Sequence, residues 1–125
     1  MQISGTMFER YGGLPFVTRL ILRFYDRVLA SGRLAPFFAN TDMQRLVEHQ
    51  AKFLSTVMGG PASYSDVVLQ ETHRHLNIDD QAFDEMMALL RETLEGANIA
   101  HADIETIIAD LNARRTHIVG AVRPM

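Results

Sequence analysis

The feature that most constrains the fold of this chain is the spacing of its apolar residues, which recur every three or four positions along most of the sequence. Between about residues 14 and 30 the recurring residues are Val17, Leu20, Ile21, Phe24 and Val28. This spacing places apolar side chains on one face of an α-helix, whereas a half-buried strand would show strict alternation. Sustained alternation occurs nowhere in the sequence. We therefore expect an all-α fold.

Capping and helix-breaking residues divide the chain into shorter elements. Thr6 and Glu9 have the spacing of a capping box, and Gly12-Gly13 ends the short helix that they begin. Residues 33–40 form an irregular corner around Pro36 that carries two adjacent phenylalanines. A helical pattern over 66–75 is short, and two longer amphipathic helices, separated by Gly96-Ala97-Asn98, complete the chain.

A third helix, opened by Thr41 or Asp42 and ended by Gly59-Gly60-Pro61, carries two polar residues on its inward face. That face consists of Leu46, His49, Gln50, Phe53, Leu54 and Val57. Polar side chains on an inward stripe need a partner, so they mark this helix as a candidate for binding chemistry.

Length and charge limit the class of protein. The 125 residues suit one domain spanning 1–125, and 47% hydrophobic with 22% charged residues is typical of a globular chain. A net charge of -3 with interleaved signs excludes a basic surface for nucleic acid. No apolar run is long enough to span a membrane and the first residues do not resemble a secretory signal, so we expect no membrane partner and a cytoplasmic location.

The absence of cysteine excludes disulfides and thiolate metal sites, which leaves histidine and carboxylate as metal ligands. Of the five histidines, His73 and His49 lie on the inward sides of their helices. Two such histidines are too few for a structural zinc site, whereas haem needs only one or two protein ligands. The alternative is that both are core histidines satisfied by hydrogen bonds.

Tyr25 follows the apolar Phe24 and lies one turn from Ile21, so its hydroxyl could enter the core. A buried phenol needs a hydrogen-bond partner, and Gln50 offers one. Together the two side chains could donate hydrogen bonds to a bound O2. The alternative is a tyrosine at the rim of the core that reaches water.

The order of several short motifs resembles the group I truncated globins. The matching runs are Phe8-Glu9-Arg10-Tyr11-Gly12-Gly13, Phe24-Tyr25-Asp26-Arg27-Val28-Leu29, Leu34-Ala35-Pro36-Phe37-Phe38, Thr41-Asp42-Met43, Glu48-His49-Gln50-Ala51-Lys52-Phe53-Leu54, Gly59-Gly60-Pro61 and Glu71-Thr72-His73. Each motif is weak alone, but their order and spacing match over nearly the whole chain. The lack of tryptophan also fits group I.

This resemblance implies a two-over-two helical sandwich around haem b. By matching position, His73 is the proximal iron ligand, Tyr25 and Gln50 are the distal hydrogen-bonding pair, and Phe38 packs on the porphyrin. Leu46 stands where many larger globins carry a distal histidine. The inward neighbours of the two histidines, Phe53 and Leu69, complete the apolar contacts that we expect for the haem.

Some expected roles are specific to a cyanobacterial-like subset of that family. In the subset, a histidine at the place of His49 binds the iron itself, which predicts a six-coordinate iron in the absence of gas; the alternative is a bond from His49 to a haem propionate. A histidine near the place of His117 attaches covalently to haem there, the alternative being a surface residue.

Charged and phenolic groups near the pocket mouth could pair with the haem propionates. The candidates in this sequence are Arg45, Lys52 and Tyr64.

The resulting functional hypothesis is a monomeric haem protein that binds O2 and NO, with CO as a further candidate ligand. One alternative is an NO dioxygenase, which would need an external electron donor or reductase because the chain has no flavin or nicotinamide motif. A second alternative is a haem-free helical interaction module in which the histidines are simply packed.

Overall fold

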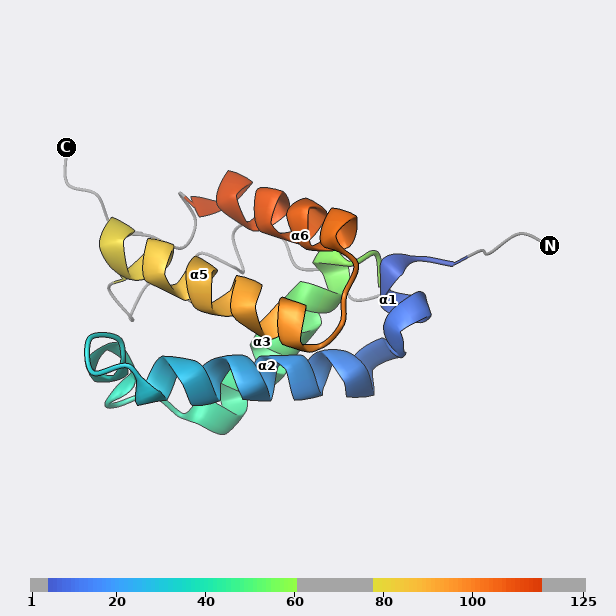
Figure 1. Cartoon of the computed structure of the whole chain (residues 1–125). Helices are drawn as coiled ribbons and strands as arrows, with labels where there is room; N and C mark the ends of the chain where they lie inside the picture. Colours follow the sequence, from blue (N-terminus) through green and yellow to red (C-terminus); the bar gives the residue numbers. More distant parts are fainter. Residues whose placement is uncertain (1–4, 61–77, 116–125) are drawn as a thin grey trace.

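The computed structural model describes residues 5–60 and 78–115, and all the regular elements in these ranges are helical. The elements are α1 (Met7–Tyr11), α2 (Gly13–Ala30), the 3-10 helix η1 (Ala35–Phe38), α3 (Met43–Val57), α5 (Asp80–Gly96) and α6 (His101–Ala113). Figure 1 shows their order along the chain. The all-α prediction is confirmed.

Local signals in the sequence begin and end these helices where expected. The Thr6–Glu9 capping box is formed at the start of α1, and Gly12, with a φ of 121°, stands between α1 and α2. The carboxylate of Asp42 accepts a hydrogen bond from the backbone N–H of Arg45 and thereby caps α3. Asp79 caps α5 in the same way through the N–H of Ala82.

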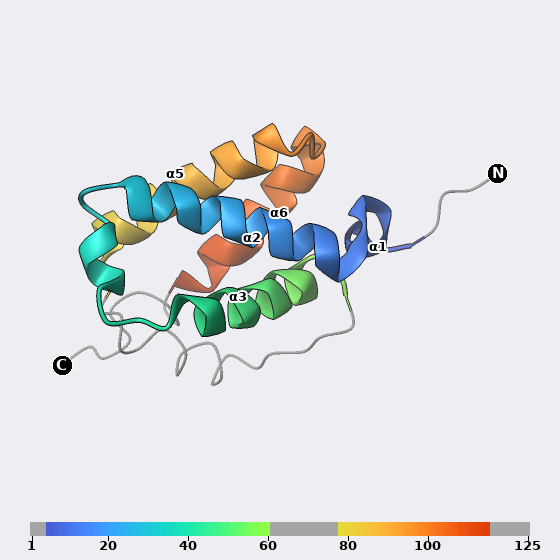
Figure 2. The same cartoon turned by 90° about the horizontal axis from the view of Figure 1, so that it is seen from below.

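The four longer helices form two antiparallel pairs. Helix α2 packs against α3 and against α5, and α6 contacts both α5 and α3. Figure 2 shows α2 and α3 running in opposite directions, with α5 and α6 forming the second pair. The arrangement is the two-over-two helical sandwich that the motif resemblance implied.

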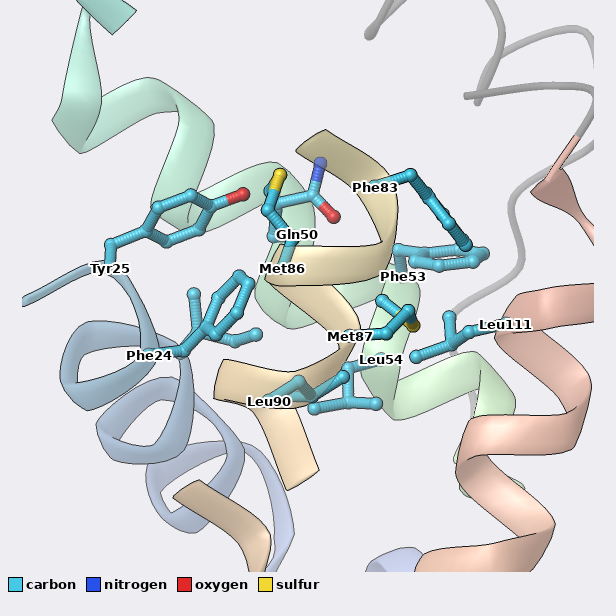
Figure 3. Close-up of a pocket in the computed structure, with 11 residues that line it drawn as sticks. Phe24, Tyr25, Gln50, Phe53, Leu54, Phe83, Met86, Met87, Leu90 and Leu111 are labelled. Atoms are coloured by element: carbon cyan, nitrogen blue, oxygen red, sulfur yellow. The ribbon is translucent and has the colours of Figure 1, made fainter. Parts of the chain in front are cut away.

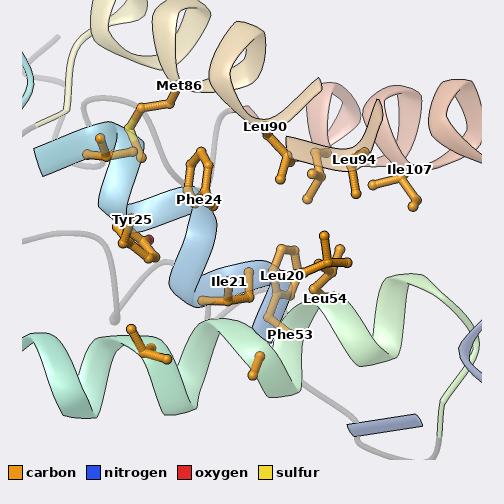
Figure 4. Packing of buried hydrophobic residues seen from close by; sticks show 14 of the residues in the cluster. Leu20, Ile21, Phe24, Tyr25, Phe53, Leu54, Met86, Leu90, Leu94 and Ile107 are labelled. Carbon is orange, nitrogen blue, oxygen red and sulfur yellow. The ribbon is translucent and has the colours of Figure 1, made fainter. Parts of the chain in front are cut away.

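The core lies between these pairs. The inward face of α2, expected from its periodicity, is buried together with residues of α3, α5 and α6 (Figure 4). From α2 the buried residues are Val17, Leu20, Ile21, Phe24, Tyr25 and Val28. On α3, Val57, the last residue of the helix, is only partly buried.

The expected helix over 66–75 lies outside the described residues. So do four expected haem contacts: Tyr64, Leu69, His73 and His117. Among the helices that the structure describes, none combines the length and the hydropathy that crossing a membrane requires.

Candidate functional site

A cavity lies between α2, α3, α5 and α6. Its lining residues are Ile21, Phe24, Tyr25, Gln50, Phe53, Leu54, Phe83, Met86, Met87, Leu90 and Leu111. The cavity has a volume of about 50 Å³, which is room for a small ligand and is below the usual range of cofactor pockets. Nine of these eleven side chains are fully apolar, so the two polar ones determine where a ligand could receive a hydrogen bond.

Tyr25 and Gln50 supply the polar side of this cavity. They come from facing elements, α2 and α3, and Figure 3 shows the Tyr25 hydroxyl directed toward the part of the cavity that Gln50 lines. Tyr25 is 4% exposed and Gln50 is 8% exposed. The structure therefore brings together the two residues that the sequence predicted as a pair.

Aromatic contacts hold the Tyr25 ring in place. The ring meets Phe24 edge-on, with centroids 4.8 Å apart, and meets Phe38 of η1 in the same way at 5.7 Å. Burial raises the pKa of the Tyr25 hydroxyl well above its usual value, because the phenolate would lose its hydration. The hydroxyl is consequently protonated at neutral pH and available as a hydrogen-bond donor.

Gln50 differs from the other buried polar side chains of the described ranges. The hydroxyl of Ser55 donates to the carbonyl of Ala51 at 2.8 Å. The Thr93 hydroxyl donates to the Leu89 carbonyl at 2.8 Å and accepts from Arg27 at 2.7 Å. Ser55 is therefore bonded within its own helix and Thr93 both within its own helix and to α2, whereas Gln50 lines a cavity. Its amide can both donate and accept, which suits a small polar ligand.

The opposite side of the cavity is aromatic. Figure 3 shows Phe53, Phe83 and Leu111 gathered beside α6, away from Tyr25. The guanidinium of Arg114 lies over the Phe53 ring, 5.5 Å from its centroid, and that of Arg115 lies over Phe83 at 4.4 Å. The sequence analysis missed both arginines, since helical periodicity does not reveal which ring a residue at the end of a helix will cover.

The remaining predicted residues of α3 lie around the cavity rather than on its wall. Leu46 is buried, and His49 is partly buried one residue before Gln50. Arg45 and Lys52 are exposed, and Arg45 borders a polar surface depression with Asp42, Gln44 and Glu48. Phe38 is buried against Tyr25. The roles predicted for these residues toward a cofactor stay predictions.

No group of three or more histidine or carboxylate side chains in the described parts of the chain could hold a metal ion. Haem iron does not need such a cluster, because the macrocycle supplies four nitrogen ligands and the protein adds one or two. An apolar wall with a phenol and an amide on one side has the chemistry to border a flat apolar cofactor and the small polar ligand that it binds. In their chemistry the residues present therefore fit haem.

Comparisons with known proteins agree with this interpretation. A family model described as bacterial-like globin matches residues 6–119. A group 1 truncated hemoglobin of Synechocystis sp. is 31% identical over 112 residues, which cover 86% of this chain and 87% of the relative. One of Tetrahymena pyriformis is 30% identical over 115 residues, or 92% and 95% of the two chains.

Solved structures show the same similarity. The Fe(III) form of truncated hemoglobin from Tetrahymena pyriformis superposes with a TM-score of 0.81 at 30% identity, covering 93% of this chain and 99% of that one. The 2/2 hemoglobin of a Synechococcus species, in the cyanomet state with covalently attached heme, gives 0.80 at 28% identity, covering 92% and 98%. The chain therefore belongs to the group 1 truncated haemoglobins of the bacterial-like globin family, and this membership implies a haem cofactor and a small gas ligand such as O2.

Proposed function

We propose that this chain binds haem b through His73 and retains O2 on the opposite face by hydrogen bonds from Tyr25 and Gln50. The observation that supports this most strongly is the Tyr25 hydroxyl: its side chain is buried, the hydroxyl is protonated and directed into the cavity, and no hydrogen bond joins it to another residue of 5–60 or 78–115. A hydroxyl that opens onto an apolar cavity is available to a ligand that accepts its hydrogen bond.

Haem supplies the iron coordination position at which a gas ligand binds, and the residues of the cavity supply everything else. Tyr25 donates through its Oη, which Phe24 and Phe38 hold in a fixed direction. Gln50 donates through its side-chain amide from the neighbouring helix. The apolar remainder of the wall excludes water, which strengthens both hydrogen bonds.

We also propose that His49 occupies the iron position opposite His73 when no gas is bound. His49 is partly buried, and it lies one turn from Leu46 on one side and from Phe53 on the other, both of which are buried. These neighbours, together with Gln50 at the next position, which lines the cavity, support the proposal. O2, NO or CO would then have to displace His49, which lowers the apparent affinity for each of them.

The rate of O2 dissociation tests the distal pair. Each hydrogen bond to the ligand contributes on the order of 1 to 2 kcal/mol, so Tyr25→Phe and Gln50→Leu should each release O2 roughly five- to thirtyfold faster. Stopped-flow displacement of O2 by CO measures the rate. The matched control is Tyr11→Phe, because the Tyr11 hydroxyl is bonded to Asp103 at the outer end of the fold.

An unchanged O2 dissociation rate in the Tyr25→Phe, Gln50→Leu double variant would refute the proposed roles. A Tyr11→Phe variant that released O2 as fast as Tyr25→Phe would do the same, since the effect would then come from a general loss of stability. NO dioxygenation needs an electron donor, so it would be recognised separately, as stoichiometric NO consumption sustained by an added reductant.

A further inference from the structure

Two consecutive arginines follow the last turn of α6 and cover two different walls of the cavity. Arg114 lies over Phe53 of α3, and Arg115 lies over Phe83 of α5. Both rings line the cavity, and both are almost fully buried, with Phe53 4% and Phe83 1% exposed. Leu111, which lines the cavity from α6, lies one helical turn before the arginines. The end of α6 therefore closes the side of the cavity opposite Tyr25.

Ion pairs hold Arg115 in its position over the ring. One guanidinium nitrogen donates to Asp80 at 2.8 Å and another donates to Asp84, so that the arginine joins α6 to the first turns of α5. The hydrogen bond to Asp84, followed by the one to Asp80, raises the pKa of Arg115. Arg114 is held by Asp110 of its own helix at 2.7 Å. The ion pairs of Arg115 therefore tie α6 to α5.

The ion pairs of Arg115 with Asp80 and Asp84 are weak enough to break and form again. The carboxylate side chains of Asp80 and Asp84 are 64% and 66% exposed, and exposed ion pairs contribute little and are screened by salt. A cation stacked on an aromatic face adds a comparable amount. Breaking the pairs would free the guanidinium that covers the Phe83 ring, one of the residues lining the cavity.

We propose that Arg115, bound to Asp80 and Asp84, positions Phe83 as a salt-sensitive closure of the cavity, and that opening of this clamp sets the rate at which small apolar ligands enter and leave beside α6. Arg114 covers Phe53 in the same way, so that Phe53 is the second ring of the closure. The inference deepens the proposed function, on which it rests for the identity of the gas; the clamp itself can be tested with a ligand that does not bind iron.

Xenon exchange and CO association measure passage through the closure. In Arg115→Met the aliphatic stem stays but the charge is lost, and we expect xenon exchange, followed by NMR, and CO association, followed by flash photolysis, to be roughly three- to tenfold faster. The matched control is Arg91→Met, because Arg91 also joins α5 to α6, through Glu105, without covering a cavity ring. Arg91→Met should leave both rates unchanged.

Salt and a second variant separate the clamp from a general loss of packing. Raising the salt concentration should accelerate xenon exchange in the wild type and have little effect in Arg115→Met, where no pair is left to screen. Asp80→Asn with Asp84→Asn leaves Phe83 and Arg115 in place and should reproduce the faster rates, while Arg115→Lys should restore part of the slow rate.

Equal rates in the wild type and in Arg115→Met, or an equal acceleration of both by salt, would overturn the proposal. Failure of the chain to take up haem would instead refute the proposed function, and the xenon measurement would still decide whether the clamp exists. The two failures are therefore distinguishable.

Discussion

Two tyrosines of the amino-terminal region show opposite uses of the same side chain. The Tyr11 hydroxyl donates to Asp103 at 2.7 Å and accepts from the backbone N–H of Ala100 at 3.0 Å, and it thereby ties α1 to the start of α6. The Tyr25 hydroxyl is more deeply buried, yet within the described ranges no hydrogen bond joins it to another residue. The Tyr11 hydroxyl is satisfied within the protein, whereas the Tyr25 hydroxyl is available to the ligand that we propose.

The contrast shows how stability and function are divided in this fold. Satisfying a hydroxyl with a carboxylate and a backbone N–H stabilises the native state. A hydroxyl that opens onto an apolar cavity makes no such contribution, and Phe24 and Phe38 pack around its ring. Variants of each region should therefore alter one property and leave the other unchanged.

The largest expected effect comes from replacing His73, the proposed protein ligand of the haem iron. His73→Ala should abolish stable haem uptake, because the chain would lose the protein ligand that the family resemblance assigns to the iron. The Soret absorbance after gel filtration of reconstituted protein measures haem retention. His101→Ala is the control, since His101 is an exposed residue at the start of α6. Unchanged spectra and haem retention in His73→Ala would remove the basis for the contrast between the tyrosines.

The second effect is a change of iron spin state at the cavity. If His49 binds the iron opposite His73, the gas-free protein is low-spin at neutral pH and His49→Leu should turn it high-spin, because one axial ligand is lost. Absorption spectra of the ferric and ferrous forms record the change. A wild-type ferrous protein that is already high-spin and five-coordinate would contradict His49 ligation and would leave Tyr25 and Gln50 as the distal residues.

Much of the fold could be predicted from the sequence, because the residues that determine it are close together along the chain. The period of α2 predicted the buried face from Val17 to Val28, and the carboxylate of Asp42 predicted the start of α3. The pairing of Tyr25 with Gln50 was also predicted, since each lies on the inward face of its own helix and helices pack through such faces. The positions of these two residues could be predicted from the spacing of apolar residues along the sequence.

Contacts between residues far apart in the sequence could not be predicted from such patterns. Tyr11 meets Asp103 across 92 positions, and Arg115 meets Asp80 across 35, and neither pair has a spacing that periodicity would reveal. Arginines at the end of a helix normally indicate a solvated surface. Only the packing of α6 against α3 and α5 places Arg114 and Arg115 over two rings of the cavity.

A third, smaller effect should appear in the stability of the two tyrosine variants. Tyr11→Phe should lower the free energy of unfolding by about 1 to 2 kcal/mol, because the carboxylate of Asp103 and the N–H of Ala100 lose their partner. Tyr25→Phe should change it by less than about 0.5 kcal/mol in the gas-free ferrous protein, or raise it slightly. Urea unfolding followed by circular dichroism measures both. A larger loss in Tyr25→Phe than in Tyr11→Phe would reverse the comparison.

The smallest effect is the acid dependence of the Tyr11 contact. The hydrogen bond from Tyr11, and secondarily the one from Arg10, holds the pKa of Asp103 below its ordinary value. A carboxyl whose pKa is lowered by folding contributes stability above its unfolded pKa of about 4, and this contribution is lost as the pH falls through the folded pKa. The stability difference between wild type and Tyr11→Phe should therefore be constant from neutral pH down to about pH 5 and shrink below about pH 4.

Urea unfolding at a series of pH values measures this difference, and Tyr25→Phe is the control. The Tyr25 hydroxyl stays protonated throughout the acid range because burial raises its pKa, so the stability difference between wild type and Tyr25→Phe should not change there. Arg10→Met should reduce the acid effect only in part, since Arg10 lies farther from Asp103, at 3.4 Å. A Tyr11→Phe difference that stayed constant below about pH 4 would mean that the hydroxyl acts mainly on the Ala100 backbone and not on the carboxylate.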